Sequence, residues 1–404
     1  MNKFGDGFRD FISLILLLTS TWSVFYLFRL VFLDKLLFLY EPGFTIKSGK
    51  ALFSASCFFA LFIGSLLVDR VNKEKFMRYW IIIGIVSILL VLFHSRSNIS
   101  FICIFLGFSN GLGLPSCLAY FSDYIEISKR GKYAGIIQLI LFLLVPILIF
   151  FSSYFNFSLK EYVIMLLFVK SFSLIPFIFQ DLKHKNLKSN NFIQIFTSRN
   201  FYLYFIPWVI FSFTNGLLNF AHNYLKKMPE YSIYFGLGPL LEISMAGIFG
   251  IVSGLAADRY GRKQPLIIGF IILGIGYAIV GIISSPISWF IHDAFAGIAW
   301  GIILICFQWL ILGDFSGFYS ADKYYALGIS IPLAFEAITL FLLDKFNLEL
   351  SPNLVGSFFS IVLFISVFPL LLAKETLPED KIKDIQFKKY LEKVFGLLEK
   401  EKKN

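Results

Sequence analysis

Long runs of apolar residues alternate with short polar segments along the whole chain. A helix needs about 20 apolar residues to cross the hydrocarbon core of a bilayer, and twelve runs approach this length. The tenth run contains two polar residues, His292 and Asp293, near its start. The pattern predicts transmembrane helices at Asp10–Leu33, Lys50–Val68, Tyr79–Phe93, Ile99–Phe121, Tyr133–Tyr154, Glu161–Phe179, Phe201–Tyr224, Ile233–Ala257, Pro265–Ser284, Ile287–Gly313, Tyr325–Leu343 and Asn353–Ala373.

The composition favours a membrane protein over a soluble one. Of the 404 residues, 57% are hydrophobic and only 15% are charged, whereas soluble domains carry about 25% charged residues. A single water-soluble domain could not bury this much apolar surface, because burial is limited by the ratio of surface to volume. We therefore expect an all-α integral membrane protein that spans the cell membrane many times, with lipid as its surroundings.

The basic residues predict the orientation in the membrane. The net charge is +10, and Lys and Arg are about three times as frequent in the termini and every second loop as in the remaining loops. This bias places both termini in the cytoplasm. The bases are not grouped with stacking aromatic residues on a soluble module, so we expect no nucleic-acid partner. The four cysteines lie inside apolar runs without metal-ligand spacing, so we expect no disulfide, metal site or cofactor.

The second half of the chain repeats features of the first half. Asp69, after the second span, is matched by Asp258 after the eighth, and Asp123, after the fourth, is matched by Asp314 after the tenth. The two matches occur in the same order at nearly the same spacing, which is typical of a duplicated unit. We expect an N-terminal six-helix bundle over residues 1–180, a cytoplasmic linker over 181–200, a C-terminal six-helix bundle over 201–375 and a basic cytoplasmic tail over 376–404.

The loop between the eighth and ninth spans carries a distinctive sequence, GLAADRYGRK, from Gly254 to Lys263. Small residues recur every four positions up to Gly254, which lets a neighbouring helix approach closely. Asp258 is placed to face a helix N-terminus and a loop arginine, and Gly261 permits a tight reversal. A weaker copy, SLLVDRVNKEK, occupies residues 65–75.

This sequence resembles the loop signature of the major facilitator superfamily, G-x-L-a-D-r-x-G-r-k. The twelve spans, the basic central loop and the stretch KETLPE after the last span are similar to that family as well. The resemblance implies two six-helix bundles related by a pseudo-twofold axis, which transport a solute by alternating access. It also implies that the signature residues latch the two halves together on the cytoplasmic side. The latch residues would be Gly254, Asp258, Arg259, Gly261, Arg262, Lys263, Asp69 and Arg70.

Four ionisable residues stand out inside the predicted spans. Such groups cost several kcal/mol each and are functional candidates by default. They are Arg29, Lys170, Glu242 and Glu336, and their formal charges cancel, which suggests pairing across the bundle interior. We interpret Glu242, Glu336 and Lys170 as candidates for proton coupling or charge pairs.

Trp22, Tyr26 and Arg29 lie on one stripe of the first span. The Tyr-x-x-Arg piece is similar to span one of organophosphate:phosphate antiporters, in which the arginine binds an anionic substrate. Those proteins use a second arginine on span seven, where this chain has Asn215 and Asn219 instead. A carboxylate, a polyol or a sugar therefore fits as well as a phosphate ester. The expected cavity residues are Trp22, Tyr26, Arg29, Gln138, Asn215, Asn219, Trp300 and Gln308.

These features favour a secondary active transporter, a symporter that moves a small polar solute, with an anion as one candidate, together with protons. A sugar or polyol facilitator, or an exporter without proton coupling, remains an alternative. A membrane sensor that keeps the fold without transport is an alternative of another class. No Ser/His/Asp or metal-ligand arrangement is visible among the four histidines, so we do not expect an enzyme. We expect a monomer whose partners are the solute, protons and membrane lipid.

Overall fold

The computed structural model describes residues 3–41, 44–179, 191–283, 285–317, 319–346 and 349–384, and also residues 387, 391 and 394. Within these residues, 12 helical segments are long and apolar enough to cross a membrane, and they confirm the twelve predicted spans. Residues 181–190 of the predicted linker and most of the predicted tail lie outside the described residues.

Helices account for nearly all of the described structure. The first half contains α1 (Lys3–Leu27), α2 (Leu33–Phe38), α3 (Ile46–Leu67), α4 (Lys73–Leu90), α5 (Ile99–Gly111), α6 (Leu114–Tyr124), α7 (Arg130–Tyr154), α8 (Leu159–Ser171) and α9 (Ile175–Phe179). The second half contains α10 (Phe192–Ile195), α11 (Arg199–Leu225), α12 (Ser232–Tyr260), α13 (Lys263–Ile282), α14 (Pro286–Ile303), α15 (Leu312–Ser316), α16 (Asp322–Phe346), α17 (Pro352–Ile365) and α18 (Val367–Leu372).

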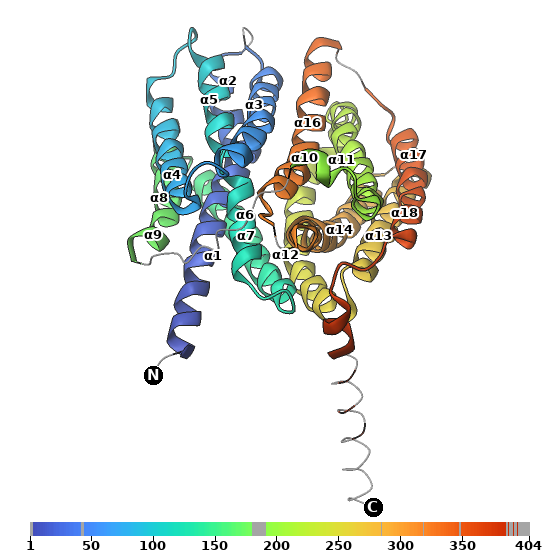
Figure 1. Cartoon of the computed structure of the whole chain (residues 1–404). Coiled ribbons are helices and arrows are strands. Elements are labelled where there is room, and N and C mark those ends of the chain that lie inside the picture. Colours follow the sequence, from blue (N-terminus) through green and yellow to red (C-terminus); the bar gives the residue numbers. More distant parts are fainter. Residues whose placement is uncertain are drawn as a thin grey trace, which may run out of the picture.

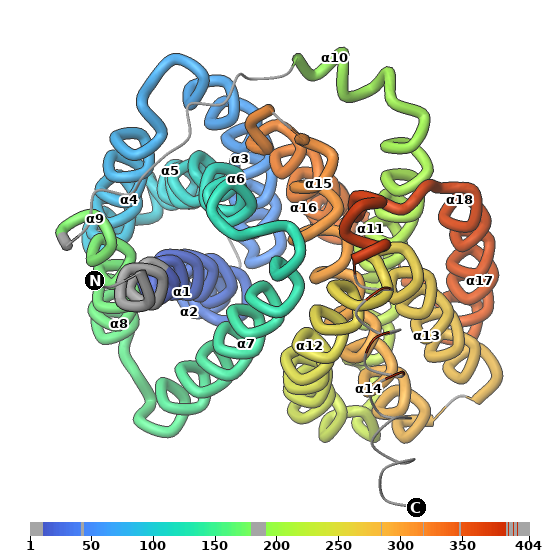
Figure 2. The backbone as a smooth tube through the Cα atoms, turned by 60° about the horizontal axis from the view of Figure 1, so that its bottom comes forward, coloured from blue at the N-terminus to red at the C-terminus, as the bar shows by residue number. Residues whose placement is uncertain are grey.

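The helices form two bundles that stand side by side, α1–α9 in one and α11–α18 in the other (Figure 1). Between the bundles, α3 packs along α16 and α7 packs along α12 (Figure 2). The helix α1 begins, and α18 ends, at the same end of the molecule. We call this end the terminal face and the other end the opposite face. Many large apolar side chains on the outside, such as Phe150, Phe168 and Ile282, are exposed, as expected where lipid replaces water.

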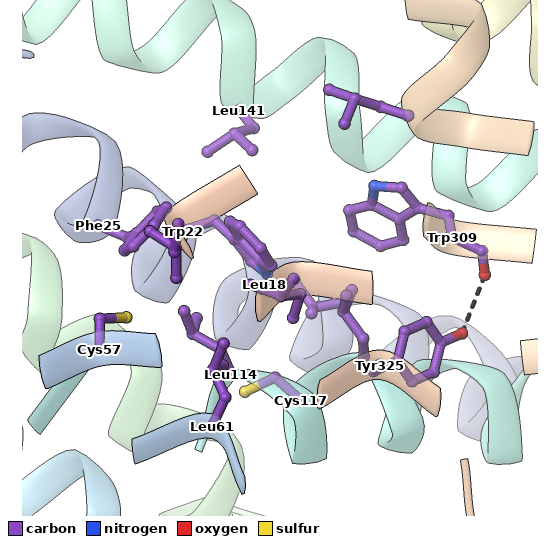
Figure 3. Packing of buried hydrophobic residues seen from close by; sticks show 14 of the residues in the cluster. Leu18, Trp22, Phe25, Cys57, Leu61, Leu114, Cys117, Leu141, Trp309 and Tyr325 are labelled. Carbon is purple, nitrogen blue, oxygen red and sulfur yellow. Dashed lines mark hydrogen bonds between the residues drawn. The ribbon is translucent and has the colours of Figure 1, made fainter. Parts of the chain in front are cut away.

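The interior of the first bundle is filled by large apolar side chains. Leu18, Trp22 and Phe25 of α1 lie near Cys57 and Leu61 of α3 in Figure 3, and all five are buried. The four cysteines of the chain are buried free thiols. Burial of this kind fixes the position of α1 within the first bundle.

Two spans contain π-helical segments that the hydrophobic pattern did not reveal. They cover Phe28–Phe32, between α1 and α2, and Leu304–Ile311, between α14 and α15. A π-helical turn frees backbone groups from the regular ladder and is frequent at functional sites. One segment contains Arg29 and the other contains Gln308, so both irregular turns carry predicted cavity residues.

The third span begins at Lys73 rather than at the predicted Tyr79. Its first turn is polar, yet Lys73 is buried because its Nζ lies 3.0 Å from a carboxylate oxygen of Asp123 and 3.0 Å from one of Asp322. The hydrophobic pattern missed this turn, since the partners that allow its burial lie far away in the sequence.

Glycines set the distance between α7 and α12. A Cβ atom on Gly254 would lie 2.1 Å from the carbonyl oxygen of Gly131, and one on Gly135 would lie 2.8 Å from that of Gly250. The two helices therefore touch backbone to backbone, as small-residue stripes permit. The contact joins the two bundles, because α7 and α12 belong to different halves.

This contact generates a stability prediction. Gly254→Ala should lower the free energy of unfolding by about 1–3 kcal/mol, because the added methyl meets backbone that does not yield. Gly236→Ala in the same helix is the matched control, since a Cβ there meets nothing within 4 Å. The control should be neutral or stabilising by up to about 1 kcal/mol. Thermal unfolding of the purified protein in detergent measures both, and equal melting temperatures would contradict the prediction.

Candidate functional site

A cavity of about 300 Å³ lies between the two bundles. Most of its wall is apolar or aromatic, which is usual for a small-molecule site. Residues from both halves of the chain contribute to it, so the cavity exists only where the bundles meet. Its side chains with polar atoms are Trp22, Tyr26, Arg29, Trp208, Asn215, Glu242, Trp300, Gln308 and Glu336.

An ion pair crosses the cavity from one bundle to the other. Arg29 Nη2 lies 2.8 Å from Glu336 Oε2, and Arg29 Nε donates to Glu336 Oε1 at 3.3 Å. Ser54 Oγ of α3 donates to Glu336 Oε2 at 2.8 Å. The guanidinium also stands 5.2 Å from the centre of the Phe25 ring. Two parallel N–H···O contacts fix the geometry as well as the charge of this pair.

Aromatic side chains form one wall of the cavity. The rings of Trp22 and Tyr26 are 6.1 Å apart, and Tyr26 meets Phe142 edge to face at 5.7 Å. Trp22 Nε1 is buried without a hydrogen-bond partner in the described structure. An unsatisfied donor in a buried place costs free energy until an acceptor arrives, so this N–H is available to a bound solute or water.

Two predicted cavity residues do not line this cavity. Gln138 Nε2 instead donates to the carbonyl oxygen of Ala246 at 3.0 Å and, weakly, to that of Gly301 at 3.5 Å. It ties α7 to the second bundle. Asn219 Nδ2 donates to the carbonyl oxygen of Gly216 on its own helix. Sequence spacing placed Asn219 on a stripe with Asn215, but the rotation of α11 brings only Asn215 into the cavity.

The other two of the four charges singled out in the sequence, Glu242 and Lys170, have different surroundings. Glu242 of α12 lines the cavity, and its carboxylate has no hydrogen-bond or ion-pair partner among the described residues. Lys170 is buried inside the first bundle, away from the cavity, with its Nζ 4.4 Å from the centre of the Trp80 ring. The ring face, rather than a carboxylate, faces this ammonium. Of the four charges, only Arg29 and Glu336 form an ion pair with each other in the described structure.

The signature residues join the bundles at the terminal face. Asp258 accepts hydrogen bonds from the backbone N–H of Gly131 at 2.9 Å and of Lys132 at 2.8 Å. Both N–H groups lie at the start of α7, where the helix dipole favours an anion. Arg262, which is fully buried, contacts Asp258 at 3.2 Å and Asp314 at 3.2 Å.

The remaining signature residues have separate positions. Gly261 has φ +92°, a left-handed conformation that favours glycine, and a Cβ there would meet Glu375. Lys263 Nζ donates to the carbonyl oxygens of Leu371 and Ala373 at the end of α18. Arg259 and Arg70 are exposed and take no part in the contacts described here between the signature residues and the other bundle.

Glu375 holds the segment after α18 against the signature loop. Its carboxylate accepts from the backbone N–H groups of Arg262, Lys263, Thr376 and Leu377 at 2.9–3.1 Å. Thr376 Oγ1 donates in turn to Asp314. The KETLPE stretch is therefore part of the terminal-face cluster.

The first half repeats this arrangement with lysines. Lys73 follows Asp69 by the same four positions that separate Arg262 from Asp258, and it contacts Asp123 and Asp322. Lys323 Nζ lies 2.8 Å from Asp69 Oδ2 across the bundles.

The sequence marked Asp123 and Asp314 as matching positions of the repeat but did not predict them as partners in these contacts. It gave no role to the other partners of the two motifs, which are Lys73, Arg130, Asp322, Lys323 and Glu375. Comparison of the two repeats position by position would have found Lys73, because it falls at the place of Arg262 in its half.

The bundles also meet at the opposite face. Ser48 Oγ donates to Asp344 Oδ2 at 2.6 Å, and Thr45 donates to the other carboxylate oxygen. These hydrogen bonds join a neutral hydroxyl to an acid, whereas the terminal face is joined by pairs of opposite charges.

Twelve spans in two bundles, around a mostly apolar cavity that contains an ion pair, are the architecture of a membrane transporter. The family described as the Major Facilitator Superfamily matches residues 42–321, and the chain belongs to this superfamily. No curated protein matches the sequence.

Solved structures of similar fold include XylE, a proton:xylose symporter bound to 6-bromo-6-deoxy-D-glucose, with a TM-score of 0.67 and 13% identity over 91% of this chain and 96% of that chain. The human organic anion transporter TETRAN has a TM-score of 0.64 and 13% identity over 89% and 97%. The E. coli fucose:proton symporter FucP has 0.64 and 12% identity over 91% and 99%. At these identities the likeness concerns the fold.

The terminal-face cluster predicts a large stability effect. Asp314 is fully buried and faces two arginines, Arg130 at 2.8 Å and Arg262 at 3.2 Å. Asp314→Asn should cost about 3–5 kcal/mol, since it leaves buried positive charge without compensation. Glu126→Gln is the control, because Glu126 is half-exposed beside Lys129 and such pairs contribute at most about 1 kcal/mol. Similar melting temperatures for the two variants would show that the cluster does not hold the bundles together.

Proposed function

We propose that this protein is a secondary active transporter that moves a small anionic solute, such as a carboxylate, across the cell membrane together with protons. The observation that carries the proposal is the ion pair between Arg29 and Glu336, which crosses the cavity from one bundle to the other. Both termini would lie in the cytoplasm, so the terminal face is the proposed cytoplasmic side.

Exchange of partners at Arg29 supplies the mechanism. A solute carboxylate fits the same bidentate geometry as Glu336 and competes with it for the guanidinium. Because Arg29 and Glu336 belong to different bundles, displacement of Glu336 removes a contact that holds the bundles together. Binding of the solute thereby weakens the contact between the two bundles and allows them to move relative to each other, as alternating access requires.

Charge balance explains why protons accompany an anion. The cavity holds one cation, Arg29, and two carboxyl groups, Glu242 and Glu336. An anionic solute adds a further negative charge to a place that is poor in water, and like charges there repel strongly. Protonation of a carboxyl group removes this repulsion. The solute and the proton therefore favour each other's binding, which couples their movement.

A sugar or polyol is the second candidate. Trp22 and Trp300 offer aromatic faces, and Asn215 and Gln308 offer amide groups, a combination that suits a ring with many hydroxyls. Two of the structures of similar fold belong to a proton:xylose symporter and a fucose:proton symporter, which supports keeping this class.

Arg29 variants test the solute class. In a thermal-shift screen of acetate, lactate, succinate, citrate, xylose and fucose, we expect stabilisation by one or more carboxylates. Arg29→Lys keeps the charge but loses the bidentate fork, so affinity for that carboxylate should fall at least about tenfold, as a loss of about 1.4 kcal/mol implies. Stabilisation by the sugars alone, with no effect of Arg29→Lys, would favour the second candidate.

Glu336→Gln tests proton coupling. In proteoliposomes, an inward proton gradient should drive accumulation by the wild type, and the variant should lose most of this response because it cannot take up a proton at that position. Glu349→Gln, an acid paired with Lys227 outside the cavity, should respond like the wild type. A full response by Glu336→Gln would exclude the coupling role of Glu336.

A further inference from the structure

A second group of buried polar side chains lies inside the C-terminal bundle, beside the cavity. Its centre is Asp293 of α14, which is 3% exposed. Asp293 Oδ1 lies 3.0 Å from His292 Nδ1 and accepts a hydrogen bond from the Tyr234 hydroxyl at 3.3 Å. The same hydroxyl lies 3.3 Å from His222 Nε2. The solute site described above uses none of these residues.

Every helix packed around Asp293 contributes to this group. The titratable residues that face it are His222 of α11, with Lys226 one turn further, Tyr234 and Glu242 of α12, Tyr277 of α13 and its own neighbour His292. Among the described residues, no lysine or arginine forms an ion pair with Asp293. The acid is therefore surrounded by groups that exchange protons rather than by a fixed counter-charge.

Two nitrogen atoms in this group lack hydrogen-bond partners. His292 Nε2 and Trp289 Nε1 are both buried, and neither has a hydrogen-bond partner in the described structure. Buried polar atoms are nearly always paired in proteins, directly or through ordered water. Buried polar atoms without hydrogen-bond partners next to a buried acid indicate a place where water or a proton is exchanged. A purely structural hydrogen-bond network would leave no such atom unpaired.

The helix register connects Asp293 to the cavity. A Cβ on Gly238 of α12 would lie 2.4 Å from Asp293 Oδ2, and a Cβ on Gly297 of α14 would lie 2.4 Å from the carbonyl oxygen of Glu242. Gly238 precedes Glu242 by four residues, as Asp293 precedes Gly297, so the two contacts are consecutive. One such step along a helix is about 6 Å. Asp293 therefore lies about one turn from Glu242, towards the opposite face, where α12 and α14 begin.

These contacts form a line of proton-exchanging groups. His222, near the end of α11 at the opposite face, is half-buried. Tyr234 bridges it to Asp293, which also contacts His292. Glu242, about one helical turn away, lines the cavity without a partner of its own. Carboxyl, imidazole and hydroxyl chains are the usual means of moving protons inside a membrane protein.

We propose that Asp293, paired with His292, is the proton-entry site of this transporter, and that it delivers protons from the opposite face to Glu242 in the cavity. The proposal rests on the proposed function for its proton coupling. A proton that enters at His222 passes to the Asp293–His292 pair and then to Glu242, which delivers it to Glu336 in the same cavity when the anion displaces Glu336 from Arg29. Each step moves one proton between two groups, so charge balances without any further reactant.

Carbodiimide labelling tests the site without a known solute. Dicyclohexylcarbodiimide reacts with protonated carboxyl groups in apolar surroundings, and mass spectrometry of the wild type locates the adduct. We expect labelling at Asp293 that is strong at acidic pH and lost at alkaline pH. Asp34, an acid paired with Lys50 outside this group, should stay unlabelled. Absence of labelling at Asp293 at every pH would overturn the proposal.

Transport separates this proposal from the proposed function. With the carboxylate panel as probe, gradient-driven accumulation should fall at least about tenfold in Asp293→Asn, as expected for loss of an essential proton-transfer group. Counterflow, which needs no net proton movement, should persist. Asp293→Glu, which keeps a carboxyl group, should retain the gradient response, and Asp34→Asn is the matched control.

A further variant covers the case in which Asp293→Asn does not fold. Tyr234→Phe keeps the ring and removes only the bridging hydroxyl, so it should slow gradient-driven uptake while counterflow is retained. A gradient response of wild-type size in both Tyr234→Phe and Asp293→Asn would overturn the entry site while leaving the proposed function intact. A wild type that ignores the gradient would instead contradict the proposed coupling, and labelling would still decide whether Asp293 binds a proton.

Discussion

A charge removed from water needs a counter-charge, and in this protein the counter-charge often comes from the other half of the chain. Lys73 meets Asp322, Asp69 meets Lys323, and Arg130 meets Asp314 across the gap between the bundles. Breaking such a buried pair costs several kcal/mol if either charge stays buried. When a face opens, however, both charges regain water, so hydration offsets much of this loss. The same contacts that hold the bundles together can therefore release them.

The two halves use this constraint with different chemistry. The terminal face is held by lysines on the first-half motif and by arginines around Asp314. A guanidinium presents a planar fork that binds several oxygens at fixed angles, whereas an ammonium is a compact charge that tolerates rotation. The repeat thus preserves the positions of the charges. The arginine contacts around Asp314 constrain the geometry more strictly than the lysine contacts of the first-half motif.

The spans and the signature loop were predictable because they depend on local features. Apolar run length located all twelve spans, and Asp258 and Gly261 were recognisable from their types and spacing. The deviations arise from long-range partners. The third span starts at Lys73, where Asn72 caps the helix and both Asp123 and Asp322 neutralise the buried lysine. Lys170 has an aromatic ring as its neighbour, which no count of acids and bases reveals. The π-helical turn at Gln308 has no recognisable pattern in the sequence, although it carries one of the polar side chains that line the cavity.

The cap made by Glu375 has a practical consequence for handling the protein. Its carboxylate gathers the N–H groups of the loop at Arg262 and Lys263 together with those of Thr376 and Leu377. The segment after the last span is therefore an anchor for the loop between α12 and α13. A fluorescent protein or affinity peptide fused directly after α18 would remove this anchor, whereas fusion beyond residue 384 leaves it in place.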